Sequence, residues 1–129
     1  MARLCITLDI PPGDLAINRR LVPQHNRHRQ PTGRLILRKS YRAALEEAAL
    51  VVRQACIRNA WPIATSNVCV TVVTHWRTAR GDAEATTKAV CDALEQGGCV
   101  ANDKLCKPLV IDAVHGDKRP RIEITVEAI

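Results

Sequence analysis

The chain has 129 residues, 47% of them hydrophobic and 25% charged, which is ordinary for one folded domain with a substantial core. A formal net charge of +6 favours an anionic partner, whereas the scarcity of aromatic residues (Trp61, Trp76, Tyr41 and no Phe) argues against a single-strand binder built on base stacking. The sequence shows neither an apolar run of membrane-spanning length nor the unbroken apolar core of a signal peptide, so we expect a cytoplasmic protein without a membrane partner.

The first expected element is a strand with one buried side. Over residues 3–10 apolar residues alternate with others, and Pro11-Pro12 ends the strand because proline cannot donate a hydrogen bond to a ladder. A long polar loop is expected over residues 13–33, followed by a short strand at residues 35–37.

This loop and the start of the next element are strongly basic. Residues 15–45 contain no Asp or Glu, so they favour a polyanion, which such a segment binds by releasing its counterions. The residues that we assign to DNA binding are Arg19, Arg20, Arg27, Arg29, Arg34, Arg38 and Lys39, with Arg80 from a later turn. The alternative is a solvated basic loop that only aids solubility.

Two helices and three further strands follow. Ser40 is a candidate N-cap for a helix that runs to about Asn59. The remaining expected elements are a strand at residues 67–76, a helix from residue 82 or 83 to 96, and strands at residues 109–114 and 121–127. Both faces of the 67–76 strand carry packable residues, which indicates cover on both sides. The order predicts a single α/β domain of the α+β type, with a mixed sheet of about four strands and two main helices.

Acidic residues stand between the second predicted strand and the second predicted helix. Asp82 and Glu84 are followed by Lys88, and Asp103 comes after a Gly97-Gly98 turn that could bring the chain back toward Asp82. Magnesium prefers a few carboxylate oxygens and several waters, and it can activate water for phosphodiester hydrolysis.

This acidic pattern has two structural alternatives. Asp82 and Glu84 suit the N-terminus of a helix, where negative side chains are favoured. Glu84, Lys88 and Asp92 are spaced four residues apart, as in a surface ladder of ion pairs.

The cysteines and histidines indicate no site of their own. The six cysteines are spread out without a CxxC pair, so we expect free thiols and neither zinc nor disulfides. His75 lies within a predicted strand and is expected to be a packed residue.

Three segments carry a resemblance to a known family. Gly81-Asp82-Ala83-Glu84, Lys88-Ala89-Val90-Cys91-Asp92-Ala93-Leu94 and Gly98-Cys99-Val100-Ala101-Asn102-Asp103 resemble, in this order, the RusA family of Holliday-junction resolvases. Pro11-Pro12 before a loop that contains Asn18, and Ser40-Tyr41-Arg42 at a helix start, are also similar to this family. The resemblance covers nearly the whole chain, so we expect a single RusA-like nuclease domain over residues 1–129.

The resemblance implies a homodimeric, magnesium-dependent endonuclease that nicks opposing strands of a four-way DNA junction, in recombination and repair. It implies manganese as the alternative ion, no small-molecule cofactor, and a family often carried by phages or prophages. By position, Asp82, Glu84 and Asp103 would be catalytic carboxylates that bind the metal, and Lys88 would be the catalytic lysine. Asp92 matches an aspartate of the family's helix, to which we give a structural role.

Three positions depart from the family pattern. Glu84 stands where a second Asp is usual, Ala85 where Asn is usual, and Asn102 in place of an acid. Because such sites tolerate little loose geometry, the alternative function is a catalytically impaired relative that binds branched DNA without cutting it. A structural or assembly protein with an incidental acidic cluster is a third. We favour the active enzyme, because Asp82, Lys88 and Asp103 remain.

Overall fold

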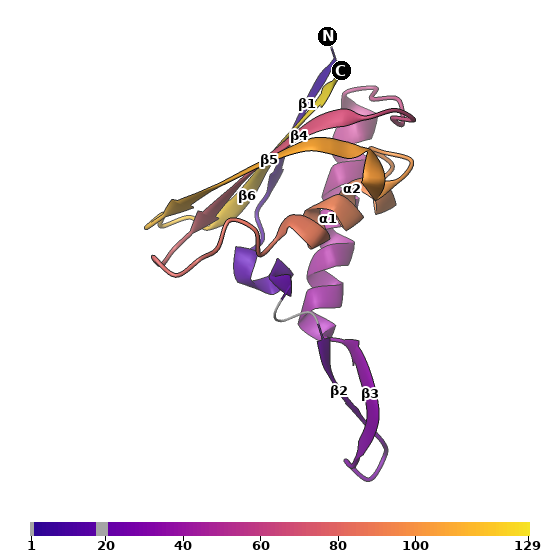
Figure 1. Ribbon diagram of the computed structural model, residues 1–129, viewed down its shortest axis with the longest axis vertical. Coiled ribbons are helices and arrows are strands. Elements are labelled where there is room, and N and C mark those ends of the chain that lie inside the picture. The colour runs from indigo at the N-terminus through magenta and orange to yellow at the C-terminus, as the bar shows by residue number, and fades with distance from the viewer. Residues whose placement is uncertain (1, 18–20) are drawn as a thin grey trace.

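Four strands form one mixed sheet in the order β1-β6-β4-β5 (Figure 1). The strands are β1 (Arg3–Leu8), β4 (Val68–Trp76), β5 (Cys106–His115) and β6 (Arg121–Ala128). β4 and β5 are parallel, whereas β6 is antiparallel to both of its neighbours, β1 and β4. The computed structural model describes residues 2–17 and 21–129. The predicted class, an α+β domain with a mixed four-stranded sheet, is confirmed.

Two helices, α1 (Lys39–Arg58) and α2 (Thr87–Gln96), cover one face of this sheet (Figure 1). Short 3-10 turns, η1 (Pro12–Leu15) and η3 (Asp103–Leu105), precede β2 and β5. The core lies between the helices and the sheet, and it is aliphatic apart from one aromatic residue, Tyr41. Its fully buried side chains include Leu4, Leu8, Val52, Val70, Val72, Val90, Leu94, Ile122 and Ile124.

No helix among the described residues covers the other face of the sheet. Cys69, Thr71 and Val73 of β4 point to this face and are partly exposed, whereas Val70 and Val72 on the helix face are fully buried. The expectation of cover on both sides is therefore wrong. Side chains of intermediate polarity tolerate partial exposure, so their packable character did not reveal which layer was missing.

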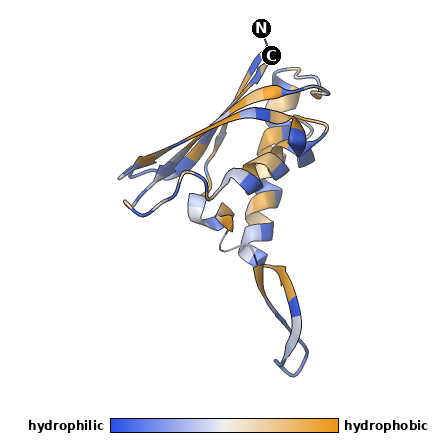
Figure 2. Ribbon diagram, viewed as in Figure 1, coloured by the Kyte–Doolittle hydropathy of each residue, from blue (hydrophilic) through white to orange (hydrophobic). Residues whose placement is uncertain are grey.

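The basic segment forms a hairpin that projects from the body (Figure 1). Its strands, β2 (Leu21–His25) and β3 (Pro31–Leu37), pair antiparallel as a separate two-stranded sheet. The predicted 13–33 loop is therefore wrong for residues 21–25 and 31–33. The stem is apolar on both faces and the tip is polar (Figure 2), so no period-two alternation marks the strands.

The other predicted elements are confirmed with shifted ends. The helix predicted from Ser40 begins at Lys39, and its N-cap residue is Arg38 without a side-chain cap hydrogen bond. The second helix begins at Thr87 and not at residue 82 or 83, because the preceding residues form turns. The six cysteines are free thiols, as expected. None of the helices in the described residues has both the length and the apolar character that crossing a membrane requires.

Candidate functional site

Three strands end at one edge of the sheet, which we call the carboxyl edge (residues 9–17, 77–86 and 116–120). β1, β4 and β5 all run toward it, since β1 and β4 are both antiparallel to β6. Its loops are hydrogen-bonded to one another: Ile17 N–H donates to the Ala85 carbonyl at 2.8 Å, and Asp117 N–H donates to the Trp76 carbonyl at 3.0 Å. Open sheets bind ligands beyond the carboxyl ends of their strands, so this edge is the natural place for a site.

Asp82 and Glu84 lie in a tight turn of the carboxyl edge. The Asp82 carboxylate accepts the Glu84 N–H at 3.1 Å, and the Asp82 carbonyl accepts the Ala85 N–H at 3.2 Å. The Glu84 carbonyl accepts the Thr87 hydroxyl at 3.0 Å, and both acidic side chains are exposed. The capping alternative is thus correct in part: Asp82 caps a turn that leads into α2, while the N-cap position itself belongs to Thr86.

Contacts with the sheet fix this turn and the loop before it. Thr86 is fully buried and its hydroxyl lies 3.4 Å from that of Thr74 on β4. His115 Nε2, at the end of β5, lies 2.6 Å from the Gly81 carbonyl oxygen. Gly81 is needed here because any Cβ at this position would overlap the ring of Trp76. Asp82 is therefore carried on a backbone anchored to two strands.

A cavity of about 330 Å³ opens beside this turn. Asp82 and Arg80 both line it, with Trp76, Thr78, Gly13 and Ala16 among the other walls. A carboxylate and a guanidinium that face one space can hold a cation and a phosphate side by side. Among the described residues assigned to DNA binding, Arg80 is the one that lines this cavity with Asp82.

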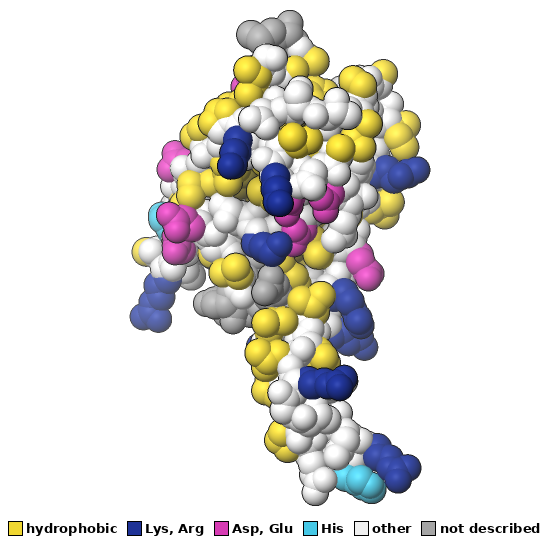
Figure 3. All heavy atoms as spheres, turned by 45° about the vertical axis from the view of Figure 1, so that its right-hand side comes forward, with side chains coloured by type: hydrophobic (Ala, Val, Ile, Leu, Met, Phe, Trp, Pro, Cys, Tyr) yellow, Lys and Arg dark blue, Asp and Glu magenta, His cyan; other side chains and the backbone are white. Residues whose placement is uncertain are grey.

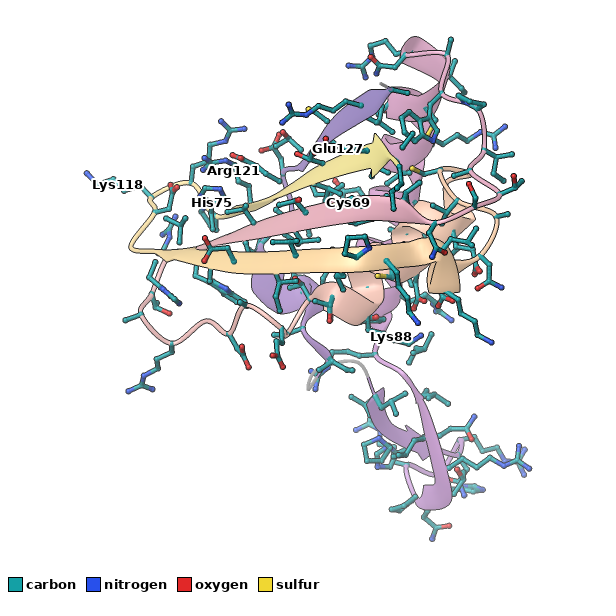
Figure 4. The ribbon with its side chains drawn as sticks, turned by 45° about the horizontal axis from the view of Figure 1, so that its top comes forward. Cys69, His75, Lys88, Lys118, Arg121 and Glu127 are labelled. Atoms are coloured by element: carbon teal, nitrogen blue, oxygen red, sulfur yellow. The ribbon has the colours of Figure 1, made fainter. Side chains whose placement is uncertain are left out.

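Lys88 lies in the first turn of α2, and Asp103 begins η3 after the end of that helix. Lys88 Nζ is 3.2 Å from an Asp92 carboxylate oxygen, and Lys88 projects from α2 away from the sheet (Figure 4). The backbone N–H of Asp103 donates to the Glu95 carboxylate at 3.1 Å.

Lys88, Asp92 and Asp103 all influence the thiol of Cys91. A hydrogen bond with Cys106 holds the pKa of the Cys91 thiol below its ordinary value, while burial and the charges of Asp103 and Asp92 oppose this shift and Lys88 supports it. The predicted ladder is confirmed for Lys88 and Asp92 by their ion pair. Asp103 acts electrostatically on the same thiol as these two residues.

The predicted carboxylates are not gathered at one point. Among residues 2–17 and 21–129, no three His, Cys, Asp or Glu side chains lie close enough together to hold a metal ion. Asp82 and Glu84 share a turn before α2, whereas Asp103 bonds to Glu95 near the end of α2. Three carboxylates suit magnesium by their chemistry. The metal site remains a prediction about how these residues act together.

The predicted DNA-binding residues fall mainly on the hairpin. Arg27, Arg29 and Arg34 are exposed along it, with Arg38 and Lys39 where it joins α1. Figure 3 shows Lys and Arg side chains along the hairpin and several acidic side chains on the body above it. Arg19 and Arg20 lie outside the described residues. The hairpin thus holds basic side chains well away from the core, where a phosphate backbone can reach them.

A polar network on the helix-free face holds the 116–120 loop. His75 Nδ1 lies 3.1 Å from Asp117, and Arg121 donates to Asp117 at 3.0 Å and to Glu123 at 2.8 Å (Figure 4). The N–H of Arg119 and the Arg121 guanidinium keep the pKa of Asp117 below its ordinary value. His75 is only 8% exposed, so it is a packed residue, as expected.

Trp76, Thr78 and Gly13 also line the Asp82 cavity, although no sequence motif assigned them to a site. The only signal in the sequence was position, because Trp76 and Thr78 lie a few residues before Asp82 and Gly13 follows the first strand. Strands that end at the same edge bring these residues together.

A family model described as endodeoxyribonuclease RusA matches residues 20–127. The chain belongs to the RusA family. The match spans the hairpin, both helices and three strands of the sheet. A search of curated proteins found no match. The RusA family is one of endodeoxyribonucleases that act on branched DNA, so the nuclease class expected from the sequence is confirmed at the level of the family.

Proposed function

We propose that this RusA-family chain is a magnesium-dependent endonuclease that resolves four-way DNA junctions by phosphodiester hydrolysis. The observation that carries the proposal is the cavity at the carboxyl edge, where Asp82 and Arg80 face one space in a chain of this family. The family supports a nuclease, and the magnesium requirement rests on the carboxylate chemistry of the predicted site. Manganese, the other ion that we expected, prefers similar oxygen ligands.

The predicted residues divide into three roles. Asp82, Glu84 and Asp103 would hold the cation, which when bound supplies Lewis acidity and an activated water. Lys88, placed beside Asp92, brings a positive group toward the charge that develops on the phosphate. Arg80, which lines the same cavity as Asp82, would orient the phosphate. No small-molecule cofactor is part of this proposal.

In this proposal the hairpin binds the DNA backbone. Arg27, Arg29 and Arg34 are exposed on an arm that stands clear of the body, which suits contact with the backbone of one junction arm. A four-way junction has two-fold symmetry, so paired cuts would come from two copies of the chain related by a two-fold axis. The homodimer is therefore part of the proposal.

Replacing Asp82 by Asn tests the proposal directly. The variant keeps the size of the side chain and an oxygen for the turn but loses the negative charge, so we expect cleavage to fall by at least about a thousandfold, with junction binding retained. Glu47→Gln, an exposed change on α1, is the matched control and should cut normally. The assay follows nicking of a synthetic four-way junction in magnesium, in manganese and in chelator. Metal-dependent cutting by the Asn variant at the wild-type rate would contradict the assignment.

A second candidate is a relative that binds branched DNA without cutting it. It is favoured by one observation, the separation of Asp103 from the turn that holds Asp82 and Glu84. Its prediction differs in the same assay: salt-sensitive junction binding with no metal-dependent nicks. Glu84→Asp, which restores the usual acid of the family, should then leave the protein without cutting activity.

A further inference from the structure

A second groove opens beside the Asp82 cavity, and we call it the proline groove. It has a volume of about 400 Å³ and mostly apolar walls, built from Pro11, Pro12, Trp76, Arg77, Thr78 and Pro120. Trp76 and Thr78 line both the groove and the Asp82 cavity. Trp76 therefore contributes to the wall of the Asp82 cavity and to the wall of an apolar groove.

Packing alone positions the indole ring. The ring lies directly on the backbone of Gly81, where no Cβ could be accommodated. Its N–H is buried and meets no acceptor among the described residues. The backbone of Trp76 is held by the hydrogen bond from Asp117. A ring fixed in this way is a preorganised surface on which a flat ligand can stack.

One basic side chain lines the groove, and two more belong to the neighbouring loops. Arg77 lines it and donates to the carbonyl of Lys118 at 3.3 Å, while Arg80 lines the Asp82 cavity. All three basic side chains are exposed. The nearby carboxylate of Asp117 is paired with Arg121. An apolar groove with basic side chains beside it complements a nucleotide, whose base has apolar faces and whose phosphate is anionic.

We propose that the proline groove holds one unstacked nucleobase of the DNA substrate, with the adjoining phosphate on Arg77 and Arg80, beside the Asp82 cavity. The inference rests on the proposed function, because it takes branched DNA as the ligand. Enzymes that act on a distorted nucleic acid commonly hold a displaced base between aromatic and apolar side chains. A branch point is where bases are most easily unstacked, so the groove would distinguish a junction from a continuous duplex.

The two tryptophans provide a direct readout. Trp61→Phe leaves Trp76 as the single tryptophan, and Trp76→Phe leaves Trp61, whose indole N–H donates to the Cys99 carbonyl at the other end of the sheet. We expect a four-way junction, added in chelator, to quench the emission of Trp76 and to leave that of Trp61 unchanged. A duplex of the same sequence should quench Trp76 less.

An abasic substrate tests the base itself. Removing the bases next to the crossover should weaken binding to the wild-type protein about tenfold, since one stacked base contributes about that much. Thr78→Tyr, which fills the groove from an exposed position, should bind the normal and abasic junctions equally. Thr65→Tyr, at an exposed position lining a groove at the other end of the sheet, is the matched control and should keep the tenfold difference.

The outcomes separate this inference from the proposed function. Equal binding of normal and abasic junctions by the wild-type protein, without quenching of Trp76, would overturn the groove and leave the nuclease proposal standing. Loss of all preference for junctions over duplex would overturn both. Because binding is measured in chelator, a protein that discriminates the bases but never cuts supports the groove and contradicts only the catalytic part of the proposed function.

Discussion

The body of the molecule and its hairpin are built on opposite principles. In the body, Leu8, Val72 and Leu94 are completely buried between the sheet and the helices. In the hairpin, every residue of β3 is exposed, and Leu35 is exposed to 65%. An isolated two-stranded hairpin is at best marginally stable in water, whereas a helix-covered sheet buries enough apolar surface to fold. The body therefore carries the stability of the fold, whereas the hairpin leaves most of its surface exposed to solvent.

The largest expected effect comes from a substitution that removes a buried side chain in the body and leaves a cavity behind. Leu94→Ala removes a fully buried side chain of α2 and should lower the free energy of unfolding by about 2–5 kcal/mol. Leu35→Ala on β3 should change it by less than about 0.5 kcal/mol. Urea denaturation of both variants measures the contrast. A destabilisation of similar size in the two variants would show that the hairpin is packed against something in solution.

A smaller destabilisation is expected where the two helices meet. A Cβ at Gly97 would lie 2.6 Å from Val52 Cγ1 and 2.8 Å from the Ala49 carbonyl oxygen, so Gly97→Ala should destabilise the protein by about 1–3 kcal/mol. In the double variant with Val52→Ala, the clash with Cγ1 is relieved while those with Val52 Cβ, at 2.7 Å, and with the Ala49 carbonyl oxygen stay, so the two effects should be less than additive. Strict additivity, measured by denaturation of the single and double variants, would mean that the helices separate without strain.

Charge removal on the hairpin should spare stability and weaken DNA binding. Changing Arg27, Arg29 and Arg34 together to Gln should leave the free energy of unfolding within about 0.5 kcal/mol of the wild-type value. The dependence of log K on log salt should flatten by about 0.9 for each phosphate that the variant no longer neutralises. Arg53→Gln with Arg58→Gln, both exposed on α1, is the control. A salt dependence that the hairpin changes leave intact would place the DNA-binding surface elsewhere.

The smallest effect concerns the loop held by Asp117. The pKa of Asp117 is lower in the folded protein than the ordinary 3.8, chiefly through the hydrogen bond from the N–H of Arg119 and then through Arg121. The ionised carboxylate therefore stabilises the fold. This contribution is complete above the unfolded pKa and is lost as the pH falls through the lower folded pKa. Asp117→Asn should therefore be less stable than the wild type near neutral pH, with a difference that shrinks below about pH 3.8. A difference that stays constant with pH would contradict this account.

The sequence predicted the body far better than the hairpin. Period-two alternation located β1, β4 and β6, and the apolar spacing of Leu45, Ala48 and Val52 located α1, because each element buries one face. In β2 and β3 the stem is apolar on both faces, and Pro23 and Pro31 are poor strand residues. The pairing of these strands depends on a turn over residues 26–30 that local patterns did not indicate.

The candidate site was predicted by residue type and only partly by position. The sequence placed Asp82 correctly in the segment between β4 and α2, because strand and helix signals lie on either side of it. Lys88 lies in the first turn of α2, as its spacing from Glu84 predicted. The position of Asp103, which begins η3 and bonds to Glu95, was not predicted in detail, because packing sets how the chain returns after a helix. Trp76 and the prolines of the proline groove come together only because three strands end at the same edge of the sheet.

The hairpin is joined to α1 through a single residue, so a rotation of α1 would move the whole hairpin. Arg38 alone separates Leu37 from the first residue of a helix whose inner face is buried. With β3 extending about 23 Å beyond this joint, a rotation of about 5° at the buried end would displace the tip by about 2 Å. Repacking α1 is thus a means of altering the reach of the basic tip without touching a single charge on it.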